Sequence, residues 1–418
     1  MSPSLTGRAG AGYSLGVKLV EITSSTGSRL FHDAARALYA GEQNWIAPLD
    51  MEIEAVFTPS KNALFADGEA IRWVLQDEAG RPIGRVAAFV NHAKAKLRSP
   101  HAGGLGFFEC VDDPAAAALL FGAARSWLAA RGLEAMDGSV NFGENYNYWG
   151  VLVEGFLPQG YGMPYNKPYY ARLFEGHGFR EFFRQYSYHL DVRKPLPERQ
   201  VKFADFLEKR LGFTYRHFDK KNPAPFVRDL VAVLNTTWSD YMEDFHPVTE
   251  QDIAPVLKSA KPILVEDFIW FAYKGEQPIG VLVAFPDVNQ VLAKFDGRLN
   301  FLNALRFLVL KSGKTITRNR LLLAGMVPEF QNSGAIGVLF LRFFRSVAKR
   351  PHYKEIELSW VGDYNPRMRK VYEQIGAVQK KVHVTYRFLF DPSRPFERFT
   401  NAGGNSGLRR DAIKKDPA

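Results

Sequence analysis

Cysteine and long apolar runs are the scarcest features of this sequence. Its one cysteine, Cys110, excludes an internal disulfide and a cysteine-based zinc cluster, so we expect a reducing compartment and no metal. No stretch reaches about 18 uncharged apolar residues, and residues 1–16 are rich in Ser and Gly without the apolar core of a secretory signal. These absences predict a cytoplasmic protein whose contact with the inner face of a membrane would be peripheral.

Charge and length narrow the class of protein further. Lys and Arg number 54 against 44 Asp and Glu, which gives the 418-residue chain a formal net charge of +10. A net positive charge favours anionic partners such as the phosphates of coenzyme A (CoA), an anionic membrane surface or nucleic acid. An ordinary basic soluble protein can have the same net charge. At this length two hydrophobic cores are expected, and 46% apolar residues supply both.

The order of predicted elements repeats once along the chain. Each half contains a β-hairpin, at 71–90 and 268–285, followed by a strand, a helix and a further strand. The predicted fold class is therefore α/β, with mixed central sheets flanked by helices in two copies of one fold. We predict a flexible tail at 1–16, a first domain at 17–192, a proline-containing linker at 193–200, a second domain at 201–390 and a disordered tail at 391–418.

A glycine-bearing turn lies between an apolar strand at 321–327 and a helix at 338–349. The turn reads Gln331-Asn332-Ser333-Gly334-Ala335-Ile336-Gly337. Backbone N–H groups at a helix start, with the positive end of the helix dipole, hold a diphosphate, and glycines let phosphate approach the backbone. An ordinary strand-to-helix turn has the same pattern. Downstream come a strand at 355–361 and a run in which Asn365 precedes Tyr372 by seven residues.

This order of strand, Gln-x-x-Gly-x-x-Gly, helix, strand and Asn-x6-Tyr-Glu-x-x-Gly-Ala resembles the acyl-CoA half of the GNAT superfamily of N-acyltransferases. The resemblance implies two tandem GNAT-like domains, of which the second binds acyl-CoA. It implies that Tyr372 protonates the departing thiolate, whereas periodicity alone makes Tyr372 a packed aromatic residue. It also implies a β-bulge, which Gly325 would permit. The implied CoA contacts are Met326, Val327, Gln331, Asn332, Ser333, Gly334, Ala335, Ile336, Gly337 and Asn365.

An amine acceptor must lose a proton, so a base is expected near the strand ends. One candidate is Glu357 on the predicted strand, with an ion pair as the equal alternative. Glu243 and His246 are further candidates, with a solvated loop as the alternative. In the first half, Phe174 replaces the tyrosine and the acidic run 110–113 replaces the glycine turn, so this degenerate copy is expected to shape the acceptor site.

Two segments fall outside the repeated order. The aromatic loop at 145–170 either walls a pocket or packs between the domains. The insertion at 287–320 contains an apolar helix that either covers an acyl tail, lies on a membrane surface or bridges the domains as a core helix. Basic residues flank this helix: Arg298, Arg306, Lys311 and Lys314.

The resemblance implies an N-acyltransferase that moves an acyl group from acyl-CoA to an amine. The apolar insertion and the aromatic loop favour a long-chain acyl group or a lipid-type, sphingoid-like amine, as in bacterial ceramide-synthase-like enzymes. One alternative is a tRNA-dependent aminoacyl transferase of tandem GNAT architecture. The intact turn and the lack of a separate Lys/Arg-rich arm argue against it, and no nucleic acid partner is expected. A non-catalytic acyl-CoA sensor is the other alternative.

Overall fold

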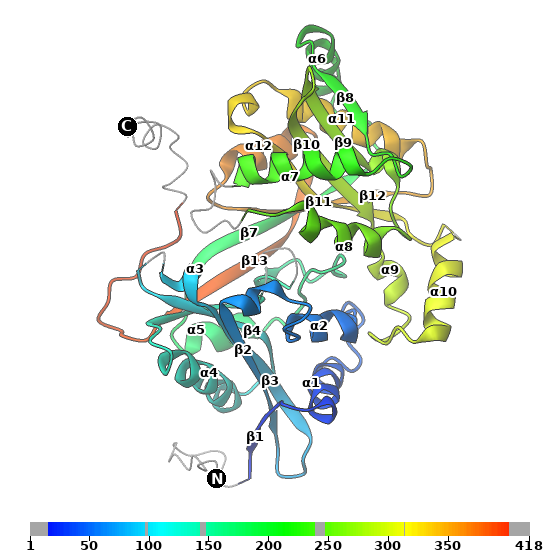
Figure 1. Cartoon of the computed structure of the whole chain (residues 1–418). Coiled ribbons are helices and arrows are strands. Elements are labelled where there is room, and N and C mark those ends of the chain that lie inside the picture. The colour runs from blue at the N-terminus through cyan, green and yellow to red at the C-terminus, as the bar shows by residue number, and fades with distance from the viewer. Residues whose placement is uncertain (1–15, 97–98, 143–147, 239–246, 313, 401–418) are drawn as a thin grey trace.

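The computed structural model describes residues 16–96, 99–142, 148–238, 247–312 and 314–400. Within these residues a 13-stranded mixed sheet runs through the whole molecule, with helices on both faces (Figure 1). The strand order is β1-β2-β3-β4-β5-β13-β7-β12-β11-β10-β9-β8, and β6 pairs with β13. The predicted α/β architecture with a mixed, helix-flanked sheet is confirmed.

The N-terminal half contains β1 (Lys18–Glu21), α1 (Ser25–Leu38), α2 (Asp50–Val56), η1 (Ala63–Ala66), β2 (Gly68–Gln76), β3 (Pro82–Asn91), α3 (His92–Lys96), β4 (Ala102–Cys110), α4 (Pro114–Ala129), β5 (Ala135–Gly138), β6 (Val151–Glu154), α5 (Tyr170–Gly176) and β7 (Arg180–Asp191). The C-terminal half contains α6 (Glu198–Arg210), β8 (Thr214–His217), α7 (Ala224–Trp238), α8 (Glu250–Ala260), η2 (Glu266–Phe268), β9 (Ile269–Lys274), β10 (Gln277–Pro286), α9 (Asn289–Leu292), α10 (Phe301–Ser312), β11 (Arg318–Met326), η3 (Pro328–Phe330), α11 (Ala335–Ala348), β12 (Glu355–Gly362), α12 (Pro366–Gln374) and β13 (Val378–Leu389). Both hairpins, β2–β3 and β9–β10, lie where the sequence predicts them. The predicted linker at 193–200 is too long, because α6 begins at Glu198.

Local sequence accounts for where two of the helices begin. Asp113 caps α4 by accepting the N–H of Ala115 at 2.8 Å, and Pro114 supplies a preset first turn. In α8 the Thr249 side chain accepts the N–H of Asp252 and the Asp252 side chain accepts the N–H of Thr249, which forms a capping box.

The last strands of the two halves are exchanged. β7, from the N-terminal half, lies between β12 and β13 and is antiparallel to both. β13, the last strand of the chain, lies between β7 and β5. Because each half's final strand completes the sheet of the other half, the two halves share one sheet. The predicted boundary after residue 192 follows the end of β7 in the sequence but does not divide the sheet.

Two predictions about the periphery need correction. The insertion helix α10 neither bridges the halves as a core helix nor covers an apolar groove with its outer face, because Phe301, Leu305 and Leu308 are exposed. The tail after residue 390 is not wholly disordered, since Phe399 packs against Phe182. Residues 1–15 and 401–418 lie outside the described part of the chain. No helix in that described part is long and apolar enough to cross a bilayer.

Candidate active site

A gap opens between two neighbouring parallel strands of the C-terminal half. β11 and β12 pair from Arg318–Glu355 to Arg320–Glu357, and within the described residues no pair follows. Beyond this point β11 stays paired with β10, and β12 stays paired with β7. Each strand therefore turns one row of backbone N–H and C=O groups towards the gap. An extended ligand that carries amides can bond to both rows, as an added strand does.

The wall of the gap on β11 carries a bulge at Leu322. The register with β10 passes from Leu323–Val283 to Leu321–Ala284, which leaves Leu322 as the extra residue. The prediction of a bulge at Gly325 is wrong, because Gly325 pairs regularly with Val281. Gly325 instead leaves room for Trp238, whose ring would lie 3.0 Å from a Cβ at this position.

The glycine turn follows β11 and opens α11. Gly334 caps the helix with a φ of 80°, a conformation that favours glycine. A Cβ at Gly334 would meet Leu207 of α6 at 2.5 Å, whereas a Cβ at Gly337 would meet nothing within 4 Å. The N–H of Gly337 donates to the Gly334 carbonyl at 3.0 Å, so the turn offers an anion the open space at Gly337 and the positive end of the helix dipole.

The other residues predicted to contact CoA have structural contacts of their own. The N–H of Val327 donates to the carbonyl of Ile279 at 2.9 Å, and Met326 is buried. The Ser333 hydroxyl accepts the N–H of Ala335 at 3.2 Å, and Gln331 Nε2 donates to the Met326 carbonyl at 3.4 Å. The Asn365 side chain caps α12 by accepting a backbone N–H at 3.1 Å. Their contact with a ligand stays a prediction, as it does for Asn332, Ala335 and Ile336.

Tyr372 and Glu357 lie on opposite faces of the sheet. Tyr372 is buried on the face covered by α11 and α12, where its ring packs edge-on against Tyr188 and Phe340, at 5.4 and 5.9 Å between centroids. Burial raises the pKa of the Tyr372 hydroxyl well above its ordinary value, so the group keeps its proton. The structure thus shows the predicted packed aromatic residue, and the role of Tyr372 as a proton donor stays a prediction.

Glu357 is fully buried in a cluster of charges on the other face. Its Oε1 lies 2.8 Å from Lys381 Nζ, and its Oε2 lies 3.6 Å from Arg318 Nε. Burial alone would raise the pKa of Glu357, but Lys381, His189 and Arg318 together hold it well below its ordinary value. The ion pair that the sequence offered as the alternative is present, and the role of Glu357 as a base stays a prediction.

Several buried polar atoms at this point lack a hydrogen-bond partner within the described residues. They are Glu357 Oε2, Arg320 Nε and Nη1, and His189 Nε2. Buried polar groups in proteins are nearly always bonded, so a concentration of unused ones indicates a place for water or ligand. The backbone of Gly160 closes the other side, because a Cβ there would lie 2.7 Å from Glu357 Oε2.

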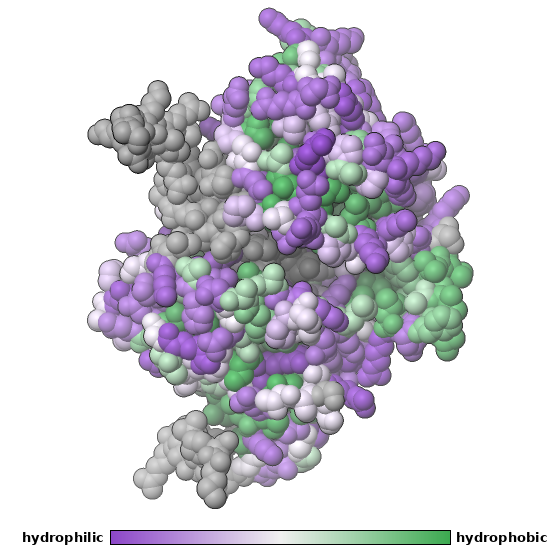
Figure 2. All heavy atoms as spheres, in the orientation of Figure 1, coloured by the Kyte–Doolittle hydropathy of each residue, from purple (hydrophilic) through white to green (hydrophobic). Residues whose placement is uncertain are grey.

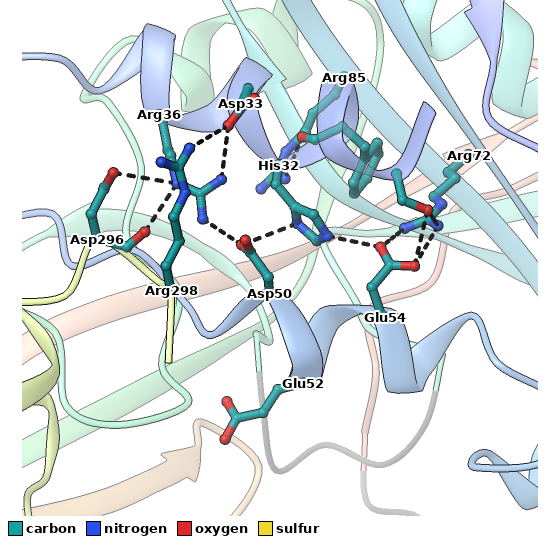
Figure 3. A network of polar contacts seen from close by, with 12 residues as sticks. His32, Asp33, Arg36, Asp50, Glu52, Glu54, Arg72, Arg85, Asp296 and Arg298 are labelled. Atoms are coloured by element: carbon teal, nitrogen blue, oxygen red, sulfur yellow. Dashed lines mark hydrogen bonds and ion pairs between the residues drawn. The ribbon is translucent and has the colours of Figure 1, made fainter. Parts of the chain in front are cut away.

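A second carboxylate near this cluster was not found from the sequence. The Glu52 side chain on α2 accepts hydrogen bonds from the hydroxyls of Tyr161 and Tyr148, the latter at 3.4 Å. Figure 3 shows Glu52 pointing away from the ion-pair network of His32, Asp50 and Glu54 on the same helices. Burial raises the pKa of Glu52, and the bond from Tyr161 opposes that rise. No sequence motif marks Glu52, because its surroundings come from a distant loop.

The segment predicted as an aromatic loop, described from residue 148 on, contains the strand β6 and has contacts of both predicted kinds. Its residues 158–161 bond to the C-terminal half: Lys381 Nζ donates to the Pro158 carbonyl at 3.0 Å, and the Tyr161 N–H donates to Asp287 at 3.0 Å. Tyr148 and Tyr165 line a cavity in the N-terminal half, where β4 and β5 separate after Leu105–Gly138. The polar end of this cavity is formed by Arg85, Glu109 and Tyr170.

The two halves differ at the positions that the sequence singled out. Asp113 occupies the start of α4 with a carboxylate, so an anion has no cradle there, and the buried Phe174 has no hydroxyl. The predicted bases Glu243 and His246 lie outside the described residues. An open helix start beside separated strands is therefore a feature of the C-terminal half.

Comparison with known proteins agrees with this geometry. No family model matches the chain. The chain is similar to the bacterial ceramide synthase of Caulobacter vibrioides, with 29% identity over 357 residues, which cover 84% of this chain and 91% of the relative. It is also similar to protein YghO of Escherichia coli, with 26% identity over 362 residues, which cover 84% of this chain and 90% of the relative.

Solved structures share the fold at low identity. A GCN5-related glucosamine N-acetyltransferase region of a fungal multi-domain GH3 beta-N-acetylglucosaminidase matches with a TM-score of 0.54 and 13% identity, over 90% of this chain and 38% of that one. A tandem GNAT protein from the clavulanic acid biosynthesis pathway matches with a TM-score of 0.53 and 11% identity, over 90% of this chain and 100% of that one. The chain thus has a tandem GNAT fold. Together with the similarity to the bacterial ceramide synthase, the fold supports an acyltransferase of GNAT type.

Proposed function

We propose that this protein is a cytoplasmic N-acyltransferase that moves a long-chain acyl group from acyl-CoA to a lipid-type, sphingoid-like amine. The observation that supports the transfer is the gap between β11 and β12, with the glycine turn at one end and buried, unbonded polar atoms at the other. The similarity to a bacterial ceramide synthase supports the lipid acceptor and the long acyl chain.

In this proposal each face of the sheet has its own task. The positive end of α11 at the turn 331–337 binds the diphosphate, and the facing edges of β11 and β12 bind the amides of the pantetheine arm. The amine attacks the thioester carbonyl carbon from the Glu357 face, so that a C–N bond forms as the C–S bond breaks. Tyr372, on the other face, gives its proton to the departing sulfur.

We propose that Glu52 is the general base, which accepts the proton of the attacking amine. A general base works best when its pKa lies near the working pH, and burial raises the pKa of Glu52. Glu357 is the poorer base, because its neighbours hold its pKa well below the ordinary value. In this assignment Glu357 keeps Lys381 and Arg318 in place, and the base role that the sequence predicts for Glu357 becomes the alternative.

A non-catalytic acyl-CoA sensor is the second candidate, favoured by the ion-paired Glu357 and the packed Tyr372. The test measures CoA release from palmitoyl-CoA and from acetyl-CoA, each with sphinganine or with a short polar amine. Thermal shifts with the same donors run in parallel, since a ligand that binds the native state stabilises it. We expect release with palmitoyl-CoA and sphinganine. Stabilisation without release would identify a sensor, and release with acetyl-CoA and the polar amine alone would exclude a lipid enzyme.

A further inference from the structure

Helix α10 is apolar on two sides although it lies at the surface. Phe307 and Leu310 pack inward against the core of the C-terminal half. Large side chains also point outward, with these exposed fractions: Phe301 76%, Leu302 68%, Leu305 48%, Leu308 49% and Val309 71%. Figure 2 shows a contiguous hydrophobic patch at the edge of the molecule, over the position of α10 in Figure 1. A patch of this kind marks an interaction surface.

The segment that carries this outward face is basic. The segment 293–315 contains one acidic residue, Asp296, and five basic ones: Lys294, Arg298, Arg306, Lys311 and Lys314. Arg298 pairs with Asp33 at 3.1 Å, and Lys311 bonds the carbonyl of Pro262. The face therefore combines apolar side chains with a basic margin, which is the composition of helices that lie in a membrane interface.

The loop that leads into α10 is fixed to the N-terminal half. The N–H of Asp50 donates to the Gly297 carbonyl at 3.0 Å, and Arg36 Nε donates to the Asp296 carbonyl at 3.0 Å. Figure 3 shows Arg36, Asp296 and Arg298 in one network with the acidic residues of α1 and α2. Because both halves hold this loop, the orientation of the apolar face is set before any partner binds.

We infer that the outward face of α10 docks this protein on an anionic lipid surface. The helix lies parallel to the surface, with its outward apolar side chains at the boundary between headgroups and acyl chains. A second copy of the chain would bring two basic margins together, whereas anionic headgroups neutralise them. This docking does not depend on which substrate the protein takes.

Vesicle sedimentation with the full chain tests this inference. We expect binding to vesicles of phosphatidylcholine mixed with phosphatidylglycerol, weak binding to phosphatidylcholine alone, and a loss of binding as salt is raised. Leu302→Ser/Leu305→Ser should lower binding about tenfold or more, because two apolar anchors are lost. Arg306→Gln/Lys314→Gln should lower binding to the anionic vesicles about fivefold for each charge.

The matched control is Phe203→Ser/Phe206→Ser on α6, which removes two exposed apolar side chains from a helix at the top of Figure 1, away from α10 at its right edge. This control should bind vesicles as the wild type does, and circular dichroism should show all variants folded. Equal binding by the wild type and the Leu302/Leu305 variant would overturn the inference. A second result would also overturn it: a wild-type protein that is a dimer and does not bind vesicles, with the variant a monomer. The face would then join two copies of the chain.

Discussion

Arg320 and Glu357 face one another as the last paired residues before β11 and β12 separate. Both side chains are buried, and each has polar atoms without a partner in the described part of the chain. Burial lowers the pKa of Arg320, while the Glu357 charge opposes that change. The pair marks the closed end of the gap.

Glu357→Gln should destabilise the protein, because it leaves Lys381 as an uncompensated buried charge, whereas Arg318 keeps its ion pair with Asp287. Breaking a buried pair in this way costs about 3–5 kcal/mol of unfolding free energy, measured by denaturant titration. Glu357→Gln/Lys381→Met should recover part of that loss. The folded pKa of Glu357 lies below its unfolded value, so its contribution is present above the unfolded pKa and is lost as pH falls through the folded one. A pH-independent difference between wild type and Glu357→Gln would contradict this account.

Gly337→Asp should weaken CoA binding by about tenfold or more, measured by calorimetry, because the new carboxylate would face the diphosphate. The fold should survive, since the position is open and an acidic residue suits the first turn of a helix. Gly122→Asp on α4 is the matched control, because that helical glycine is also open. Gly334→Asp is a poorer test than Gly337→Asp, because φ is positive at Gly334 and Leu207 fills the space beside it. Unchanged CoA affinity in Gly337→Asp would refute the diphosphate assignment.

Tyr372→Phe should lower turnover by roughly ten- to a thousandfold and leave thioester affinity unchanged, as the loss of a general acid does. The buried rings around Tyr372 would keep their packing, so the melting temperature should change little. Tyr188→Phe serves as the control, because it removes a hydroxyl bonded to Glu373 at 3.2 Å on the neighbouring ring. Equal turnover in Tyr372→Phe and wild type, with chemistry limiting, would leave Tyr372 as a packing residue.

Glu52→Gln should lower kcat/KM by about a hundredfold or more and remove the acid limb of its pH profile. Because burial raises the pKa of Glu52, that limb in the wild type should lie above the ordinary range of a glutamate. The bond from Tyr161 lowers this pKa, so Tyr161→Phe should move the limb to higher pH. If the limb survives in Glu52→Gln and vanishes in a folded Glu357 variant, the base is Glu357.

Local features of this fold could be predicted from the sequence, and features made by distant contacts could not. The two hairpins were predicted correctly, and the caps at Asp113 and Thr249 likewise depend on residues close in the chain. The exchange of β7 and β13 was missed, because strand pairing across about 200 residues has no local signal. For the same reason Glu52 was missed, and the bulge was placed at Gly325 because glycine was the only local cue.

The choice of acyl chain should depend on the gap and not on α10. The sequence suggested that Phe301, Leu305 and Leu308 hold the acyl tail, but these side chains face outward. Trp238 is the better candidate, because its ring covers Gly325 on the β11 wall of the gap. Each methylene that moves from water into an apolar groove contributes about 0.8 kcal/mol at full burial, so dissociation constants should fall steeply from acetyl-CoA to palmitoyl-CoA.

Trp238→Ala should therefore flatten this chain-length series while CoA itself binds with unchanged affinity, because the diphosphate turn lies elsewhere. Phe301→Ala/Leu305→Ala/Leu308→Ala is the control, and it should keep the wild-type series in a vesicle-free assay. A series that flattens in the triple variant and not in Trp238→Ala would show that α10 holds the chain after all. A flat series in the wild type would exclude a long-chain donor and favour a small acyl group, since no length of chain would then gain by burial.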